Sequence, residues 1–97
     1  MTATVAPEQL VFIALQANSD TISIIEAIMA DNPRAVLNEY PAMVKIDAPG
    51  RLVIKRETIE EALGRSYDLR ELQLNLISLG GSVDESEDEF ILEWKRG

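Results

Sequence analysis

The stretch of residues 35–56 constrains the fold most, because it holds three short segments of strand-forming residues separated by two breaks. Val44 and Ile46 alternate with charged neighbours in the second segment, and the third segment repeats this alternation. A period of two puts successive side chains on opposite faces of a strand, so each strand should have one apolar face. Pro49-Gly50 suits a tight turn between the second and third segments. The pattern predicts an antiparallel meander whose apolar face the rest of the chain covers.

Two further elements are predicted before the meander. Residues 10–15 form the continuous apolar run LVFIAL, whose length is typical of a strand covered on both faces, so we expect it at the centre of the sheet. An amphipathic helix is predicted over about residues 22–31, with Asp20 as its N-cap and Asn32-Pro33 as its stop. The apolar stripe of this helix is expected to contain Ile22, Ile25, Ile28 and Met29, with Ile24 beside it.

A second, shorter helix is predicted after the meander. Thr58 and Glu61 stand three residues apart, which is the spacing of a capping box. The helix should therefore run over about residues 59–63. We expect it to end at Gly64, since glycine readily takes the left-handed conformation of a helix C-cap.

The C-terminal third should supply two strands. Residues 72–76 alternate strictly, which predicts a strand with three leucines facing inward. Residues 80–82, Gly-Gly-Ser, break this strand, and an acidic loop is expected over residues 84–89. The alternation over residues 89–95 predicts the last strand.

These elements predict a single α+β domain of the order β-α-β-β-β-α-β-β. Ninety-seven residues are too few for two hydrophobic cores. We expect a mainly antiparallel sheet arrangement with two helices packed on one side. The domain should span residues 8–97, after a flexible N-terminal leader at residues 1–7.

Composition excludes several classes of chemistry. The chain has no cysteine and no histidine, so a disulfide framework, a thiol nucleophile and imidazole chemistry are all unavailable. The net charge of −8 makes a nucleic-acid partner implausible, because that affinity rests on lysine and arginine neutralising phosphates. No stretch approaches the roughly 20 apolar residues of a membrane span, and no signal peptide is evident. We expect no catalytic residue, no metal and no cofactor, and a cytoplasmic location.

The acidic segment at residues 84–89 has two interpretations. It is either a solvated loop that keeps the protein soluble or a surface that steers docking toward a basic protein. It lacks the spacing and central glycine of an EF-hand calcium loop. The function classes left by the residues alone are a protein-interaction module and a small-molecule-binding or self-associating module of ferredoxin-like type.

Several segments together resemble the regulatory, or effector, proteins of bacterial multicomponent di-iron monooxygenases. The resemblance covers about residues 9–95 and is strongest to the regulatory component of phenol hydroxylases. It rests on the order and spacing of several weak motifs. These are Asp31-Asn32-Pro33, Asn38-Glu39-Tyr40-Pro41-Ala42-Met43-Val44, Arg51-Leu52-Val53-Ile54, Leu63-Gly64-Arg65-Ser66-Tyr67-Asp68-Leu69, Leu72-Gln73-Leu74-Asn75, Gly81-Ser82-Val83-Asp84-Glu85 and Phe90-Ile91-Leu92-Glu93-Trp94.

The resemblance implies a non-catalytic protein without metal, flavin or nucleotide. Such a protein binds the hydroxylase component, whose large subunit holds a di-iron centre, and it is required for efficient coupled hydroxylation of aromatic substrates. The free protein is expected to be a monomer or a weak dimer.

The resemblance also implies a partner-binding surface around the second helix and its neighbouring loops. Each candidate has a structural alternative: Thr58 and Glu61 could cap the helix, Arg65 could pair with Asp68, and Met43 could belong to the core. The implied contact residues are Asn32, Met43, Thr58, Glu61, Ala62, Arg65, Asn75 and Ser78.

Overall fold

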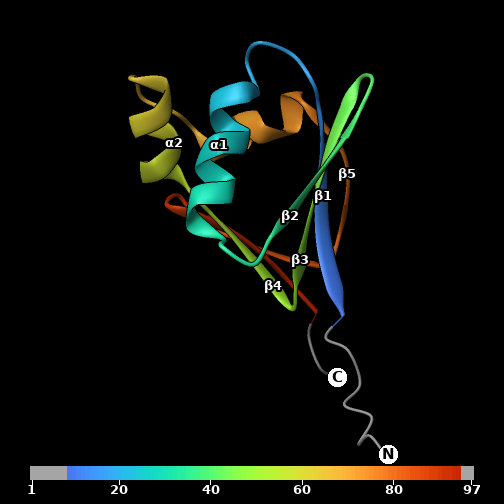
Figure 1. The fold of residues 1–97 in the computed structure, drawn as a ribbon. Coiled ribbons are helices and arrows are strands. Elements are labelled where there is room, and N and C mark those ends of the chain that lie inside the picture. The colour runs from blue at the N-terminus through green and yellow to red at the C-terminus, as the bar shows by residue number, and fades with distance from the viewer. Residues whose placement is uncertain (1–8, 95–97) are drawn as a thin grey trace, which may run out of the picture.

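Two antiparallel sheets and three helical segments form the fold, which the computed structural model describes for residues 9–94. The predicted leader at residues 1–7 lies outside the described residues. The elements are β1 (Leu10–Gln16), α1 (Ile22–Asp31), β2 (Val36–Tyr40), β3 (Met43–Pro49), β4 (Arg51–Lys55), α2 (Arg56–Leu63), the 3-10 helix η1 (Leu69–Leu74), β5 (Leu76–Gly80), β6 (Ser82–Glu85) and β7 (Glu89–Glu93) (Figure 1). The predicted α+β class is therefore confirmed.

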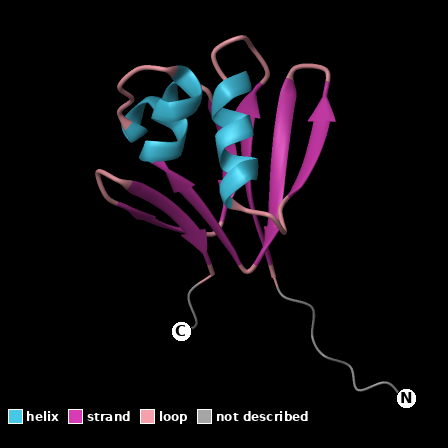
Figure 2. Cartoon of the chain, turned by 60° about the vertical axis from the view of Figure 1, so that its left-hand side comes forward, coloured by secondary structure: helices cyan, strands magenta, loops and turns pink. Residues whose placement is uncertain are grey.

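The core lies between the two sheets and the helices. The first sheet has the strand order β2-β3-β1-β5 and the second β4-β7-β6, and neighbouring strands are antiparallel. Figure 2 shows the two sheets diverging, with the helices in the opening between them. The apolar strand β1 occupies an interior position as predicted, and Val11, Ile13 and Leu15 on it are almost fully buried.

The predicted meander is wrong in its last step, because β4 leaves the sheet of β2 and β3. Strand β3 already has β2 on one edge and the seven-residue β1 on the other. No edge of β3 is free, so β4 pairs instead with β7 in the second sheet. Gly50 has a φ of 77°, and its N–H donates to the Gln9 carbonyl oxygen at 2.9 Å, which directs the chain out of the first sheet.

The predicted strand at residues 72–76 is wrong: residues 69–74 form the 3-10 helix η1. A capping box outweighs the apolar alternation here, because the Asp68 carboxylate accepts from the Arg70 N–H and the Glu71 carboxylate accepts from the Asp68 N–H, each at 2.9 Å. Leu72 is buried, but Leu74 is 75% exposed, so the three leucines do not share an inward face.

Helix α1 spans the predicted residues, but Thr21 and not Asp20 is at the N-cap position. The Asn18 carboxamide oxygen accepts from the N–H groups of both Asp20 and Thr21 and so holds the loop before the helix. The buried Thr21 hydroxyl donates to the Gln16 carbonyl oxygen at 2.7 Å, which ties the helix start to the end of β1.

The buried face of α1 also differs from the predicted stripe. Ile24, Ala27 and Ile28 are buried, whereas Ile22, in the first turn, is 60% exposed. The helix ends at Asp31 as expected, but Asn32 has a φ of −131° and does not adopt the left-handed conformation.

Helix α2 begins at Arg56 and not near Ile59, and Thr58 does not cap it. The Arg56 N–H donates to the Asp88 carbonyl oxygen at 2.9 Å, so the turn between β6 and β7 supplies a partner for the helix N-terminus. The predicted end is confirmed: Gly64 is the C-cap, with a φ of 72°.

The segment predicted as an acidic loop is largely a hairpin. Residues 82–85 form β6, which pairs with β7, and only residues 86–88 connect the two strands. The predicted break before this segment is confirmed at Gly81, and the predicted last strand is confirmed as β7.

Candidate functional site

Asn32, a predicted contact residue, is buried inside the protein. Its side chain is 8% exposed and bonds both backbone groups of Val53 in β4: the carboxamide nitrogen donates to the carbonyl oxygen at 2.7 Å, and the carboxamide oxygen accepts from the N–H at 2.9 Å. The same nitrogen donates to the Ile28 carbonyl oxygen at 2.7 Å. Asn32 therefore ties the end of α1 to β4, which continues directly into α2.

Helix α2 carries three predicted contact residues on one face, and a fourth follows the end of the helix. Thr58, Glu61 and Ala62 have the spacing i, i+3 and i+4, and Arg65 comes directly after the C-cap Gly64. Glu61, Ala62 and Arg65 are exposed and Thr58 is half-buried, while Ile59 holds the helix to the core. Arg65 does not pair with Asp68; its guanidinium donates to the Ser66 carbonyl oxygen at 2.9 Å.

The other three predicted residues lie on or next to the first sheet, away from α2: Met43 in β3, Ser78 in β5, and Asn75 at the end of η1, directly before β5. Met43 is the register partner of Gln16, whose N–H donates to the Asn75 carbonyl oxygen at 2.8 Å, so Met43 and Asn75 flank the end of β1. Ser78 in β5 pairs with Ala14 further along the strand. Figure 1 shows α2 and β5 on either side of α1. The structure thus brings the predicted residues together in two separate groups.

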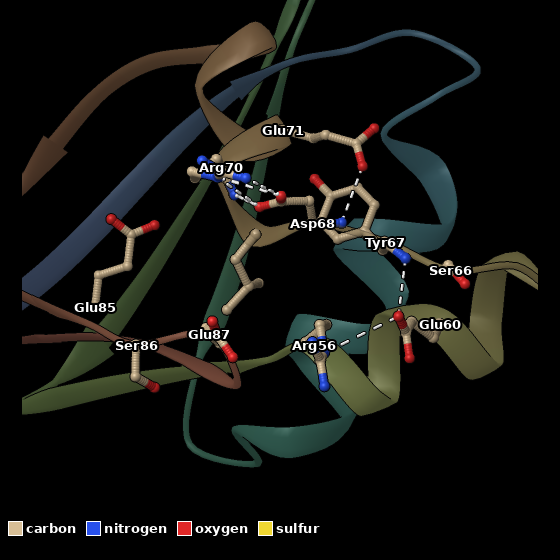
Figure 3. Close-up of a pocket in the computed structure, with 11 residues that line it drawn as sticks. Arg56, Glu60, Ser66, Tyr67, Asp68, Arg70, Glu71, Glu85, Ser86 and Glu87 are labelled. Atoms are coloured by element: carbon tan, nitrogen blue, oxygen red, sulfur yellow. Dashed lines mark hydrogen bonds and ion pairs between the residues drawn. The ribbon is translucent and has the colours of Figure 1, made fainter.

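An acidic groove, which the sequence reasoning missed, lies beside α2. It encloses about 940 Å³ between α2, the segment at residues 66–71 and the β6–β7 hairpin (Figure 3). The available sequence signal was the Asp68/Glu71 capping-box spacing, which fixes one wall. The charged lining residues are Arg56, Glu60, Asp68, Arg70, Glu71, Glu85 and Glu87.

Asp68 and Arg70 form the shortest ion pair of this groove. The Arg70 guanidinium donates to the Asp68 carboxylate, with Nη2 to Oδ2 at 2.6 Å. This hydrogen bonding lowers the pKa of Asp68 from 3.8 to about 2 and raises the pKa of Arg70. Because the folded-state pKa of Asp68 is depressed, its contribution to stability is present at neutral pH and is lost as the pH falls toward 2. Both side chains are exposed, so the contribution is small.

Tyr67 is the buried polar residue of the groove. Its side chain is 5% exposed, and its hydroxyl has no hydrogen-bond partner among the described residues. Burial, reinforced by the Glu71 carboxylate, raises its pKa to about 12. The Tyr67 N–H donates to the Glu60 carboxylate at 2.8 Å, which fixes the residue against α2.

Tyr67→Phe is expected to leave the free energy of unfolding unchanged or to raise it by about 1 kcal/mol, because it removes a buried hydroxyl that forms no bond. Urea unfolding followed by circular dichroism measures this. Tyr40→Phe, at a half-exposed position, is the matched control and should change the free energy by less than about 0.5 kcal/mol. A loss above about 1 kcal/mol in Tyr67→Phe would mean that the hydroxyl has a partner in solution.

A second hollow, of about 420 Å³ and mainly apolar, lies between α1 and β2. Ile22, Ile25, Leu37 and Val44 supply its apolar lining. Its place beside the edge strand β2 accounts for the exposure of Ile22.

Comparison with known proteins assigns this fold to a family. The profile of the MmoB/DmpM family matches residues 9–93, nearly the whole chain. The chain belongs to the MmoB/DmpM family. Among the described residues, no helix is long and apolar enough to cross a membrane, and no three acidic side chains are placed to hold one metal ion.

Two curated relatives show what the chain is similar to. One is the phenol 2-monooxygenase stimulatory component DmpM of Pseudomonas sp. (strain CF600), with 51% identity over 89% of this chain and 96% of the relative. The other is the effector subunit of the alkene monooxygenase system of Xanthobacter autotrophicus (strain ATCC BAA-1158 / Py2), with 31% identity over 86% of this chain and 84% of the relative.

Solved structures agree with the MmoB/DmpM assignment. A chain in a structure of the phenol hydroxylase–regulatory protein complex is 54% identical, with a TM-score of 0.86 over 90% of this chain and all of that chain. The soluble methane monooxygenase regulatory protein B, at 19% identity, has a TM-score of 0.72 over 97% of this chain and 71% of its own, which shows the shared fold.

Proposed function

We propose that this chain is the regulatory (effector) component of a multicomponent monooxygenase of the phenol hydroxylase type. It acts in the cytoplasm, binds the di-iron hydroxylase component through that component's large subunit and takes no part in the chemistry as a catalyst. The main support is the 51% identity to a phenol monooxygenase stimulatory component, which extends over 96% of that relative. Similarity over nearly the full length of both chains includes the surface as well as the core.

The physical role follows from differential binding. A protein without a reactive group can raise the rate of an enzyme only if it binds one state of that enzyme more tightly than another. A tenfold change in the balance of two states requires about 1.4 kcal/mol of differential affinity, which a small docking surface can supply.

We place the docking surface on the exposed side of α2 and just beyond its end, at Thr58, Glu61, Ala62 and Arg65. The first three share one helix face and Arg65 follows the C-cap, whereas Met43, Asn75 and Ser78 form the second group and are proposed as further contacts. Asn32 supports the surface from within, because it fixes β4, from which α2 begins.

The test is a reconstitution with the hydroxylase and reductase components of the same system. Adding the protein at stoichiometric amounts should raise the rate of phenol oxidation by about tenfold or more, together with the yield of product per electron consumed. An unrelated acidic protein of similar size is the control. If rate and yield stay unchanged, the proposed function is wrong. A small alkene assayed in parallel distinguishes the substrate classes in the names of the two relatives.

A further inference from the structure

The acidic groove beside α2 contains more negative charge than the chain neutralises. Both of its arginines are already paired: Arg56 with Asp88 at 2.9 Å and Arg70 with Asp68 at 2.6 Å. Glu85 and Glu87, on the hairpin wall, are exposed and form no direct ion pair or hydrogen bond within the described part of the chain, although both lie near enough to Arg70 to help raise its pKa. The groove therefore presents two carboxylates without a direct partner.

The Tyr67 hydroxyl is a second, independent sign that the groove is incomplete in the free protein. A buried hydroxyl usually has a hydrogen-bond partner, and leaving one without a partner costs free energy. Tyr67 is more than nine-tenths buried, lines this groove and has no bond at its oxygen within residues 9–94. Figure 3 shows its ring beside the carboxylates of Asp68 and Glu71, whereas the Glu60 carboxylate lies at the Tyr67 N–H. An acceptor surrounded by carboxylates matches a cationic donor.

We propose that this groove receives a basic side chain, an arginine or a lysine, that the hydroxylase component presents on docking. This inference rests on the proposed function. A guanidinium has five N–H donors, so it can bond carboxylates on both walls of the groove, and it reaches the buried phenolic oxygen once the side chains over that oxygen move aside. An arginine–carboxylate contact of this kind fixes the orientation of the bound protein.

The position of the groove connects it to the docking surface. Arg56 and Glu60 belong to α2, so this helix forms one wall of the groove and also carries the proposed contact face. Charges of one sign around a groove raise the rate of encounter with an oppositely charged partner, and this effect weakens as salt is added. The groove thus aligns α2 on the hydroxylase during approach.

The experiment compares two double variants of equal charge change. E85Q/E87Q removes the free carboxylates of the groove, and E26Q/E39Q removes two exposed carboxylates beside α1 and β2. Binding to the hydroxylase is measured by titration at low and at physiological ionic strength. E85Q/E87Q should weaken binding by about tenfold at low ionic strength and reduce its dependence on salt, while E26Q/E39Q should change it by less than about twofold. Equal effects of the two variants would overturn the proposal.

Tyr67→Phe provides a readout that a merely structural role would not give. It should weaken hydroxylase binding by about threefold while leaving the stability of the free protein unchanged or improved. Unchanged binding in this variant would exclude the hydroxyl from the contact and overturn the proposed geometry.

Two further outcomes separate this inference from the proposed function. If the wild-type protein stimulates the hydroxylase and E85Q/E87Q binds like E26Q/E39Q, only the groove assignment fails. If the wild-type protein does not stimulate the hydroxylase at all, the proposed function is wrong.

Calorimetry with Ca²⁺ tests a competing role for the groove. If the free protein binds Ca²⁺ and E85Q/E87Q abolishes this binding, the groove is a metal site and the proposal is overturned.

Discussion

Replacing Ala62 with tryptophan is expected to reduce stimulation of the hydroxylase by at least about tenfold, equivalent to roughly 1.4 kcal/mol of lost binding. Ala62 is exposed in the penultimate position of α2, between Glu61 and Leu63. A bulky indole at the centre of a docking face prevents close approach of the partner, and the centre of an interface contributes most to affinity. The substitution buries nothing in the free protein, so its free energy of unfolding should change by less than about 1 kcal/mol.

Ala30→Trp is the matched control, because Ala30 is also an exposed alanine on a helix, here α1. The same exchange costs the same helix propensity at both sites. Stimulation by Ala30→Trp should stay within about twofold of wild type. Full activity of Ala62→Trp, or an equal loss in both variants, would rule out the α2 face as the specific docking surface.

Asn32→Ala is expected to lower the free energy of unfolding by about 2–4 kcal/mol. The Asn32 carboxamide bonds the N–H and carbonyl of Val53 and the carbonyl of Ile28, and alanine leaves all three backbone groups without this partner. Urea unfolding measures the loss. An m-value equal to that of wild type would show that the unfolding transition itself is unchanged. Because β4 leads into α2, the same variant should also weaken stimulation.

Two comparisons make the result for Asn32 specific. Asn38→Ala removes a single hydrogen bond to the Asp47 carboxylate and should cost less than about 1 kcal/mol. Asn32→Asp keeps the acceptor for the Val53 N–H but directs a negative charge at two carbonyl oxygens, so it should be at least as damaging as alanine at neutral pH. An Asn32→Ala protein within about 1 kcal/mol of wild type would contradict the role assigned to this side chain.

Elements with a strong local signal were predictable from the sequence. The apolar run before α1 predicted the interior strand β1, and Gly64 predicted the end of α2. The partner of β4 was not predictable, since the choice depends on whether the edges of β3 are already occupied by strands distant in the chain. At Leu74, a capping box six residues earlier overrode the apolar alternation.

The candidate site divides in the same way. The resemblance implied contacts at Thr58, Glu61, Ala62 and Arg65 around the second helix; in the structure the first three lie on one face of α2 and Arg65 follows its C-cap. The acidic groove is formed by three segments that meet only in the folded chain, so no local sequence pattern predicts it. The role of Asn32 was missed because a side-chain amide that bonds a distant strand leaves no mark on sequence periodicity.

The carboxamide of Asn32 also covers part of an exposed sheet edge. β4 lies at the outer edge of its sheet, and the exposed backbone groups of an edge strand are a template onto which a foreign strand can add. By bonding both groups of Val53, Asn32 occupies the middle of that template. The free protein therefore has one exposed sheet edge fewer onto which another chain could add a strand.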